Sequence, residues 1–345
     1  MARASMKGRC QAMSLSERAR ASMKRVTIPR TDLRVSRICL GTAGMGSEMG
    51  QKQSFAMLDA FVAAGGNFLD TAHVYADWLP GEKHRSEKTI GQWLKKSGQR
   101  DQVVLATKGA HPDLATMHIS RLSPQEIAAD VAESLDCLGL RAIDLYWLHR
   151  DDPARPVGEI MEALNEQIRA GRVRHVGCSN WRPGRIQEAQ SYAAAHGLAS
   201  FVASQPMWSL AMVNPGTVPD DIAVVDDEAL AYYRGAEMAV IPFSSQARGF
   251  FAQASAGGVD ALKEGVRRTY ENDQSRARLT RAQDLARRLG ASVTAVALAS
   301  ITAQPFVAVP IVGCRSLDQL ADTLASADLT LTPAQLDYLT TGHGS

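Results

Sequence analysis

Short apolar runs alternate along the chain with longer segments in which apolar positions recur every three or four residues. This alternation predicts strands buried on both faces, each followed by an amphipathic helix. The predicted strands cover residues 37–41, 67–70, 103–108, 143–149, 174–179, 201–205, 238–244 and 307–313. The predicted helices after them cover residues 54–66, 86–96, 123–139, 157–171, 183–197, 226–237, 291–303 and 316–326. Eight such units in succession predict an α/β fold with a closed (β/α)8 barrel rather than an open doubly wound sheet.

Segments outside these units predict additions to the barrel. Residues 24–41 hold two short alternating runs around a turn-like PRTD, which predicts a β-hairpin that plugs one end of the barrel. Residues 211–227 and 246–290 are too long for simple loops, and the second stretch carries a charged helical segment. Insertions on the C-terminal face of a barrel often cover the active site. The residues after Leu331 predict one final helix.

Composition supports one large domain. The chain has 345 residues, 45% hydrophobic and 21% charged, a length that fits either two small domains or one barrel. With the eight successive units, residues 23–345 are predicted to form a single barrel domain. Residues 1–22 are rich in Arg and Ser and have no apolar segment, so a disordered extension is expected rather than a secretory signal. A transit peptide, or a start codon assigned upstream of Met23, would fit the same composition.

Net charge and cysteine content indicate which kinds of partner and which compartment to expect. The net charge is only +2 and the basic residues are scattered, so no nucleic-acid surface is expected. No apolar run reaches the roughly 18 residues that a membrane span needs. The five cysteines are widely spaced and form no CxxC pair, which favours free thiols in a reducing cytoplasm. The expected partner is a small molecule, and the oligomeric state stays open.

Polar residues with catalytic chemistry stand at or just after the ends of three predicted strands. Asp70 ends one strand and Tyr75 follows it, Lys108 ends the next strand, and His149 ends the third. The C-terminal ends of parallel barrel strands converge in space. A lysine cation, kept charged by a carboxylate, is expected to lower the tyrosine pKa from about 10. The tyrosine then donates a proton to a carbonyl oxygen while the histidine orients the carbonyl.

Competing chemistries lack their motifs. Neither GxGxxG nor GxxxxGK occurs, which removes the main support for a Rossmann or P-loop site, and no GxSxG marks a hydrolase. His73 and His84 lie near one loop, and His111 and His118 follow the third strand. Because neither HExxH nor paired CxxC is present, no metal site is predicted, and these histidines are expected to be loop or pocket-wall residues.

An ordered series of motifs extends from about Leu40 to Leu324, over about four-fifths of the chain. It comprises LGTAGMG, FLDTAHVY, SEKTIGQWL, ATKG, IDLYWLHRDD, GCSNW, SQPMWSL, IPFSSQARGFF and VPIVGCRSLDQL. In this order and spacing the chain resembles the aldo-keto reductase superfamily. The resemblance implies a TIM barrel, a nicotinamide cofactor bound without a Rossmann domain, and a catalytic tetrad. The tetrad residues are Asp70, Tyr75, Lys108 and His149.

The resemblance also assigns cofactor contacts. They fall on Gly41, Thr42, Ser179, Asn180, Gln205, Phe243, Ser244, Gln246, Arg248, Gly313, Arg315, Gln319, Asp322 and Thr323. The residues of GCSN and SQP match positions that hold the nicotinamide carboxamide, which suits amide groups because they both donate and accept. The aromatic residue of IPFSS matches one that stacks on the nicotinamide ring. The following SSQ departs from the Ser-Pro-Leu that the family often has over the pyrophosphate.

The segment after the eighth strand matches the part of the family that recognises the adenosine 2′-phosphate. Arg315 suits a phosphate because its guanidinium gives paired, charge-assisted hydrogen bonds. Gln319 and Thr323 replace a commoner Arg and Asn, and Asp322 replaces Glu. NADPH is therefore the expected cofactor, and NADH stays open.

Three tryptophans follow matched site residues by a few positions: Trp78, Trp181 and Trp208. Together with nearby aspartates they predict an aromatic, acidic rim suited to a polar, sugar-like or oxygenated ring carbonyl, although ordinary packing would give the same pattern. The expected activity is NADPH-dependent reduction of an aldehyde or ketone to an alcohol. The alternatives are an NAD-dependent sugar or polyol dehydrogenase and a nucleotide-binding partner with slow turnover, like the potassium-channel β subunits.

Overall fold

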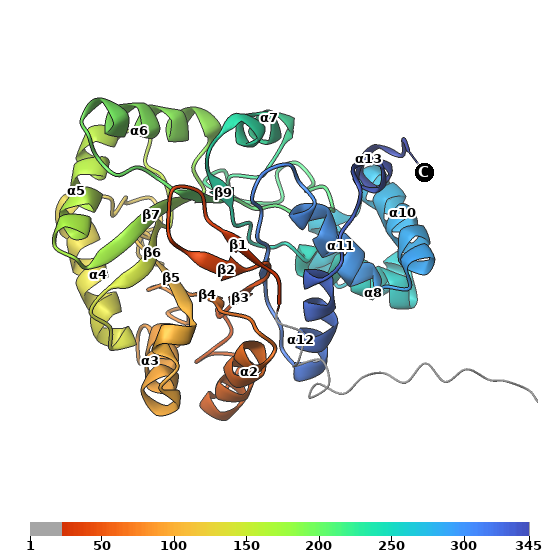
Figure 1. Ribbon diagram of the computed structural model, residues 1–345, viewed down its shortest axis with the longest axis horizontal. Coiled ribbons are helices and arrows are strands. Elements are labelled where there is room, and N and C mark those ends of the chain that lie inside the picture. The colour runs from red at the N-terminus through yellow and green to blue at the C-terminus, as the bar shows by residue number, and fades with distance from the viewer. Residues whose placement is uncertain (1–22, 345) are drawn as a thin grey trace, which may run out of the picture.

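The computed structural model describes residues 23–344 and places eight parallel strands in one curled sheet surrounded by helices (Figure 1). The strands are β3 (Cys39–Gly41), β4 (Phe68–Asp70), β5 (Val104–Gly109), β6 (Ile143–Leu148), β7 (Val173–Ser179), β8 (Ala203–Gln205), β9 (Ala239–Val240) and β10 (Ile311–Val312). Neighbouring strands follow chain order from β3 to β9, and β10 lies beside β3. Each strand overlaps one predicted from the sequence.

The segment that leads into β10 joins the last strand of the sheet to the first. The backbone N–H of Val240 in β9 donates to the carbonyl of Val307 over 2.9 Å, and the N–H of Val309 donates back to Val240 over 2.9 Å. Two residues later, Ile311 of β10 pairs in parallel register with Cys39 of β3. These bonds connect the two edges of the sheet as a barrel requires, so the predicted (β/α)8 architecture is confirmed.

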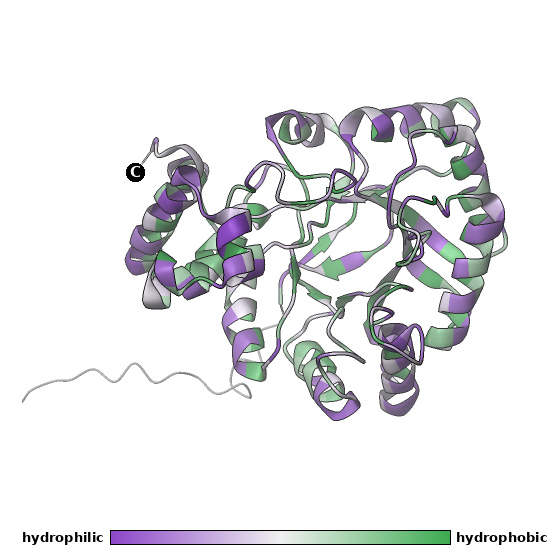
Figure 2. Ribbon diagram, turned by 180° about the vertical axis from the view of Figure 1, so that it is seen from behind, coloured by the Kyte–Doolittle hydropathy of each residue, from purple (hydrophilic) through white to green (hydrophobic). Residues whose placement is uncertain are grey.

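The eight predicted barrel helices are all present. They are α2 (Gln51–Ala63), α3 (Arg85–Ser97), α4 (Pro124–Leu138), α5 (Val157–Arg169), α6 (Pro183–Ala195), α7 (Asp227–Gly235), α11 (Val293–Thr302) and α12 (Leu317–Leu324). Helix α4 begins where the sequence predicts. Ser123 and Glu126 form a reciprocal capping box, and Pro124 occupies the first turn of the helix. Seen from the opposite side, the helices carry hydrophilic residues on their outward faces (Figure 2). Across residues 23–344, no helix is both long and apolar enough to cross a membrane.

The predicted hairpin closes one end of the barrel. Strands β1 (Arg25–Thr27) and β2 (Arg34–Ser36) pair antiparallel. Ile28 and Val35 of the hairpin are fully buried, in one cluster with Phe68 and Trp147 of the barrel strands. The hairpin therefore fills the N-terminal mouth with apolar side chains, which leaves the opposite mouth for chemistry.

The insertion after β9 forms a lateral layer. It contains α8 (Phe250–Gly257), α9 (Glu264–Tyr270), α10 (Asp273–Leu289) and the 3-10 turns η2 (Ala247–Gly249) and η3 (Val259–Ala261). Two further turns, η1 (Arg100–Gln102) and η4 (Ala325–Ala327), and the final helix α13 (Pro333–Thr341) complete the described elements. The single charged helical segment predicted here is in fact broken at Asn272, whose side chain accepts from the Ser275 N–H and starts a new helix. Helices α8, α10 and α13 pack beside α11 at the side of the barrel (Figure 1), so this part of the insertion does not cover the strand ends.

Candidate active site

Asp70, Lys108 and Tyr75 meet at the C-terminal end of the barrel. The Lys108 Nζ lies 2.5 Å from Asp70 Oδ2 and 3.1 Å from the Tyr75 hydroxyl. Asp70 ends β4, Lys108 lies near the end of the neighbouring β5, and Tyr75 follows in the loop after β4. Parallel register of adjacent strands thus brings together three side chains that are up to 38 positions apart.

Buried hydrogen bonds hold the ion pair in place. The Lys108 ammonium also donates to the carbonyl of Thr71 over 2.7 Å. On the other side, Asp70 Oδ1 accepts from the Trp147 indole over 3.1 Å and from the Gln205 amide over 3.0 Å. Asp70 and Lys108 are each about 1% exposed. A buried ion pair is tolerated when its remaining hydrogen-bonding positions are satisfied, and here they are largely filled.

Trp147 was not predicted as part of the site, although the sequence contained a signal for it. Side chains alternate across a strand, so Trp147 shares a face with His149, two residues later. Its indole is one of the two donors that orient Asp70.

The electrostatics of the site differ from one sequence prediction. Burial raises the pKa of Tyr75 above its ordinary value of 10.0, by more than the Lys108 ammonium lowers it. Lys108 does lower this pKa as expected, but the net shift is upward, because loss of solvent disfavours the phenolate more strongly. Burial also lowers the pKa of Lys108, but Asp70 and Tyr75 more than compensate and raise it above 10.5. At neutral pH the site thus holds a protonated phenol beside a charged lysine.

His149 lies edge-on to Tyr75, with ring centroids 6.0 Å apart, and edge-on to His111 at 4.6 Å. Burial lowers the pKa of His149 well below 6.5, and the pKa of His111 is lowered by burial as well. The His149 Nδ1 is buried without a hydrogen-bond partner among the described residues. A neutral imidazole in this place can orient a carbonyl group by a hydrogen bond. The expectation that His111 is a pocket-wall residue agrees with its packing on His149.

The expected carboxamide contacts lie beside the tetrad. Asn180 has a left-handed backbone (φ 63°), and its amide nitrogen donates to the His149 carbonyl over 3.1 Å. The Ser179 hydroxyl donates to the Gln205 carbonyl over 2.9 Å, while the Gln205 amide holds Asp70. The three residues therefore form one hydrogen-bonded group with Asp70 and His149. Phe243 is partly buried between two core clusters.

The segment expected near the pyrophosphate has an unusual backbone. Ser244, Ala247 and Arg248 all have positive φ, at 54°, 48° and 52°. Non-glycine residues in this conformation are strained and often mark functional sites, and left-handed residues in turns can direct N–H groups at anions. Gln246 bridges to the next segment, since its amide donates to Thr323 over 3.1 Å and accepts from the Gly313 N–H over 3.1 Å. The loop that departs from Ser-Pro-Leu is thus held by its glutamine.

The segment after β10 offers a guanidinium to solvent. The Arg315 side chain is 67% exposed and forms a 2.9 Å ion pair with Glu48, while its backbone N–H donates to Gln319 over 2.8 Å. Asp322 is exposed on α12, whereas Thr323 is buried against Cys314 and Gln246.

Gly41 and Thr42 have packing roles that their motif did not reveal. A Cβ on Gly41 would come within 2.8 Å of the Ile311 side chain, so glycine permits β3 to pack against β10. Thr42 is fully buried, and its hydroxyl donates to the Asp70 carbonyl over 3.0 Å. Gly41 therefore supports the contact between β3 and β10, and Thr42 supports the end of β4.

The three tryptophans do not form one rim. Trp78 is 52% exposed and its ring lies 6.4 Å from that of Tyr75, centroid to centroid. Trp181 is only 1% exposed, because it packs on Phe201 and donates its indole N–H to the Arg150 carbonyl. Trp208 is partly buried against the core cluster and stacks on Phe306. The predicted rim is thus corrected at one position: Trp181 packs in the core, whereas Trp78 and the partly buried Trp208 remain candidate substrate contacts.

Comparison with known proteins agrees with this geometry. A family model described as the aldo/keto reductase family matches residues 37–341. The chain is 32% identical over 319 residues to an uncharacterized oxidoreductase, YrpG, of Bacillus subtilis, covering 90% of this chain and 92% of that protein. It is 30% identical to an aryl-alcohol dehydrogenase [NADP(+)] of Phanerodontia chrysosporium, over 90% of this chain and 83% of the relative. It is 29% identical to the norsolorinic acid reductase stcV of Emericella nidulans, over 90% of this chain and 79% of that relative.

Proposed function

This chain belongs to the aldo/keto reductase family, and on that premise we propose that it reduces a ring-bearing aldehyde or ketone with NADPH, using Tyr75 as proton donor. The family membership makes it an NAD(P)H-dependent oxidoreductase. The observation that supports the proposed roles most directly is the Lys108 ammonium within hydrogen-bonding distance of both Asp70 and Tyr75.

The proposed proton transfer follows from the charge at this site. When the carbonyl oxygen gains negative charge, the Tyr75 phenol gives up its proton to that oxygen. The phenolate left behind is stabilised by the Lys108 ammonium, 3.1 Å from the hydroxyl oxygen. Asp70 keeps this ammonium charged and oriented in a buried site. His149, held neutral, positions the carbonyl beside the phenol.

The residues present fit a nicotinamide dinucleotide, which when bound supplies the hydride. Ser179, Asn180 and Gln205 offer polar side chains next to the tetrad for the carboxamide. Phe243 offers an aromatic face, and Arg248 and Arg315 offer exposed cations for phosphates. Arg315 supports the proposed preference for NADPH, because its charge suits the additional phosphate.

The proposed substrate class rests on Trp78 and on the relatives. An exposed tryptophan beside the proton donor favours a flat or ring-shaped substrate. The names of two relatives refer to aryl alcohols and to norsolorinic acid. Conversion in a reducing cytoplasm is the proposed setting, consistent with free thiols at the four cysteines that the structure describes.

A substrate panel with NADPH absorbance tests this proposal. Aryl aldehydes, keto-sugars and short alkyl aldehydes are compared with NADPH and with NADH. The proposal expects turnover with NADPH and a higher kcat/KM for ring-bearing carbonyls. A preference for NAD⁺ with polyols would favour the dehydrogenase alternative, and slow turnover throughout would favour the nucleotide-binding alternative.

A further inference from the structure

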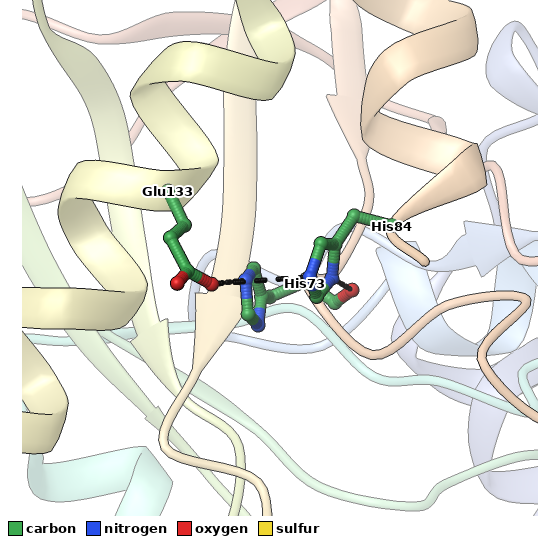
Figure 3. A group of neighbouring side chains, drawn as sticks. All are labelled: His73, His84 and Glu133. Carbon is green, nitrogen blue, oxygen red and sulfur yellow. Dashed lines mark hydrogen bonds and ion pairs between the residues drawn. The ribbon is translucent and has the colours of Figure 1, made fainter. Parts of the chain in front are cut away.

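A second cluster of polar side chains, outside the tetrad, joins three elements of the barrel (Figure 3). His73 lies in the loop after β4, His84 directly precedes α3, and Glu133 lies on α4. One ligand atom from each residue lies within 4.8 Å of the others. The proposed reduction uses none of these three side chains.

The spacing of the atoms matches that of a small coordination site. His73 Nε2 lies 2.9 Å from Glu133 Oε2, and His84 Nε2 lies 3.8 Å from the same oxygen. Ligands of a tetrahedral zinc ion are about 3.4 Å apart, since each lies about 2.0–2.2 Å from the metal. The two imidazole rings are stacked, with centroids 3.7 Å apart and planes 19° apart. Because a ring nitrogen binds a metal in the plane of its ring, both rings must turn out of this stack to share one ion.

The tautomer of His84 is fixed in the form that a metal needs. Its Nδ1 lies 2.7 Å from the His73 carbonyl oxygen, which can only accept, so Nδ1 carries the hydrogen. In the neutral ring Nε2 then presents its lone pair toward Glu133. A backbone carbonyl that accepts from the other ring nitrogen is the usual support of a metal-binding histidine.

The backbone also holds this histidine in place. His84 has a left-handed conformation (φ 57°), and its N–H donates to Asp77 Oδ1 over 2.7 Å. The Glu133 side chain is 60% exposed, so the cluster is open to solvent on one side.

We propose that His73, His84 and Glu133 bind one divalent transition-metal ion, for which Zn²⁺ is the best match, with water completing the coordination. Two imidazoles and one carboxylate are a ligand set that zinc accepts. Local sequence spacing gave no sign of this site, because Glu133 is 60 positions from His73 and reaches it only through the fold. The proposal therefore revises the sequence expectation that no metal site is present.

An ion in this place would tie the loop between β4 and α3 to helix α4. That loop, residues 73–84, also carries Tyr75 and Trp78. Metal binding is thus expected to stabilise the loop, and it does not depend on which substrate the enzyme reduces.

Calorimetric titration of the chelator-treated full chain with Zn²⁺ tests the site. Wild type is compared with Glu133→Gln and with His84→Asn, which keeps a residue that tolerates the left-handed backbone. His118→Asn, which removes an exposed histidine outside the cluster, is the matched control. We expect one ion per chain in wild type and in the control, and at least about a 10-fold weaker affinity in both cluster variants.

Thermal unfolding with and without Zn²⁺ gives a second readout. The ion should raise the Tm of wild type and of His118→Asn, and should raise the Tm of the cluster variants less or not at all. Circular dichroism without metal shows which variants fold; because the two substitutions lie on different elements, either folded variant decides the result. Zn²⁺ binding that neither cluster variant weakens, or no binding by wild type, would overturn the proposal.

Discussion

Lys108 carries a charge although it is only about 1% exposed. Its interactions with Asp70, Tyr75 and Thr71 offset the cost of burying that charge. Such a pair is costly to break, since removing one partner leaves the other as an unpaired buried charge. The same residue thus affects both the stability of the barrel and the proposed chemistry.

Lys108→Met should show both effects. The variant should lose about 3–5 kcal/mol of unfolding free energy, because Asp70 keeps a buried carboxylate without its cation. It should also lose nearly all reductase activity, because the Tyr75 phenolate loses its stabilising charge. Urea unfolding and steady-state rates measure the two losses.

The control for that variant is the double change Asp70→Asn with Lys108→Met. Removal of both charges should restore most of the stability and none of the activity. If the single variant unfolds within about 1 kcal/mol of wild type, the buried pair is not the constraint described here.

Among the secondary-structure elements, α3 packs on the barrel through a buried carboxyl group. Glu87 is fully buried, accepts from the Thr107 hydroxyl of β5 over 2.5 Å, and its Oε2 has no hydrogen-bond partner among the described residues. Burial raises the pKa of Glu87 from 4.5 to about 7. The folded protein therefore binds this proton more tightly than the unfolded chain.

Glu87 should make stability fall as the pH rises. Its contribution is fully present below pH 4.5 and is lost as the pH passes through about 7. By pH 8 the loss amounts to roughly 3 kcal/mol, at 1.36 kcal/mol per pKa unit. Glu87→Gln should remove this pH dependence between pH 5 and pH 8 in urea unfolding, while the exposed Glu82→Gln should keep it. Equal pH dependence in wild type and Glu87→Gln would refute the assignment.

The loop between β10 and α12 is the element on which cofactor preference is proposed to depend. Arg315→Ala should weaken NADPH binding by about 1.5–3 kcal/mol, as expected for a lost charge-assisted hydrogen bond, and should leave NADH binding nearly unchanged. Fluorescence titration with both cofactors checks this. Glu48→Gln, which removes the acidic partner of Arg315, should leave the NADPH affinity unchanged or raise it. An unchanged ratio of NADPH to NADH affinity in Arg315→Ala would mean that this loop does not bind the 2′-phosphate of NADPH.

Elements were easier to predict from the sequence than the contacts between them. Each barrel helix and strand has a period or an apolar run of its own, so all eight units were foreseen. The break at Asn272 was missed because the segment 268–290 is helical in composition on both sides of the cap. Trp181 was misplaced because position after a strand does not decide whether a side chain turns toward the mouth or the core. The pKa direction of Tyr75 depends on burial, which no local pattern reports.

In the whole molecule, the barrel is closed by residues 307–312, which pair with both β9 and β3. The hairpin fills the mouth opposite the tetrad, and its buried residues Ile28 and Val35 belong to the barrel interior. Residues 1–22, expected from the sequence to be a disordered extension, lie outside the described residues. Met23, where the described part begins, is already buried.

A chain that begins at Met23 should therefore fold and act like the full chain. The sequence of residues 1–22 contains no apolar period and none of the candidate site residues. Its Tm and kcat should match those of the 345-residue protein in parallel thermal melts and NADPH assays. A large drop in either value would show that the extension contributes to the barrel or to catalysis.

The Tyr75→Phe variant tests whether Tyr75 donates the proton in a site organised by Asp70 and Lys108. The measurement is single-turnover reduction of the best carbonyl substrate, together with NADPH affinity determined by fluorescence titration. We expect a rate lower by about 10²–10⁴ with unchanged NADPH affinity, because the phenol transfers a proton and does not hold the nucleotide. A variant that keeps more than about a tenth of the wild-type rate, with NADPH affinity intact, would contradict this expectation, since loss of a general acid costs about 10² or more.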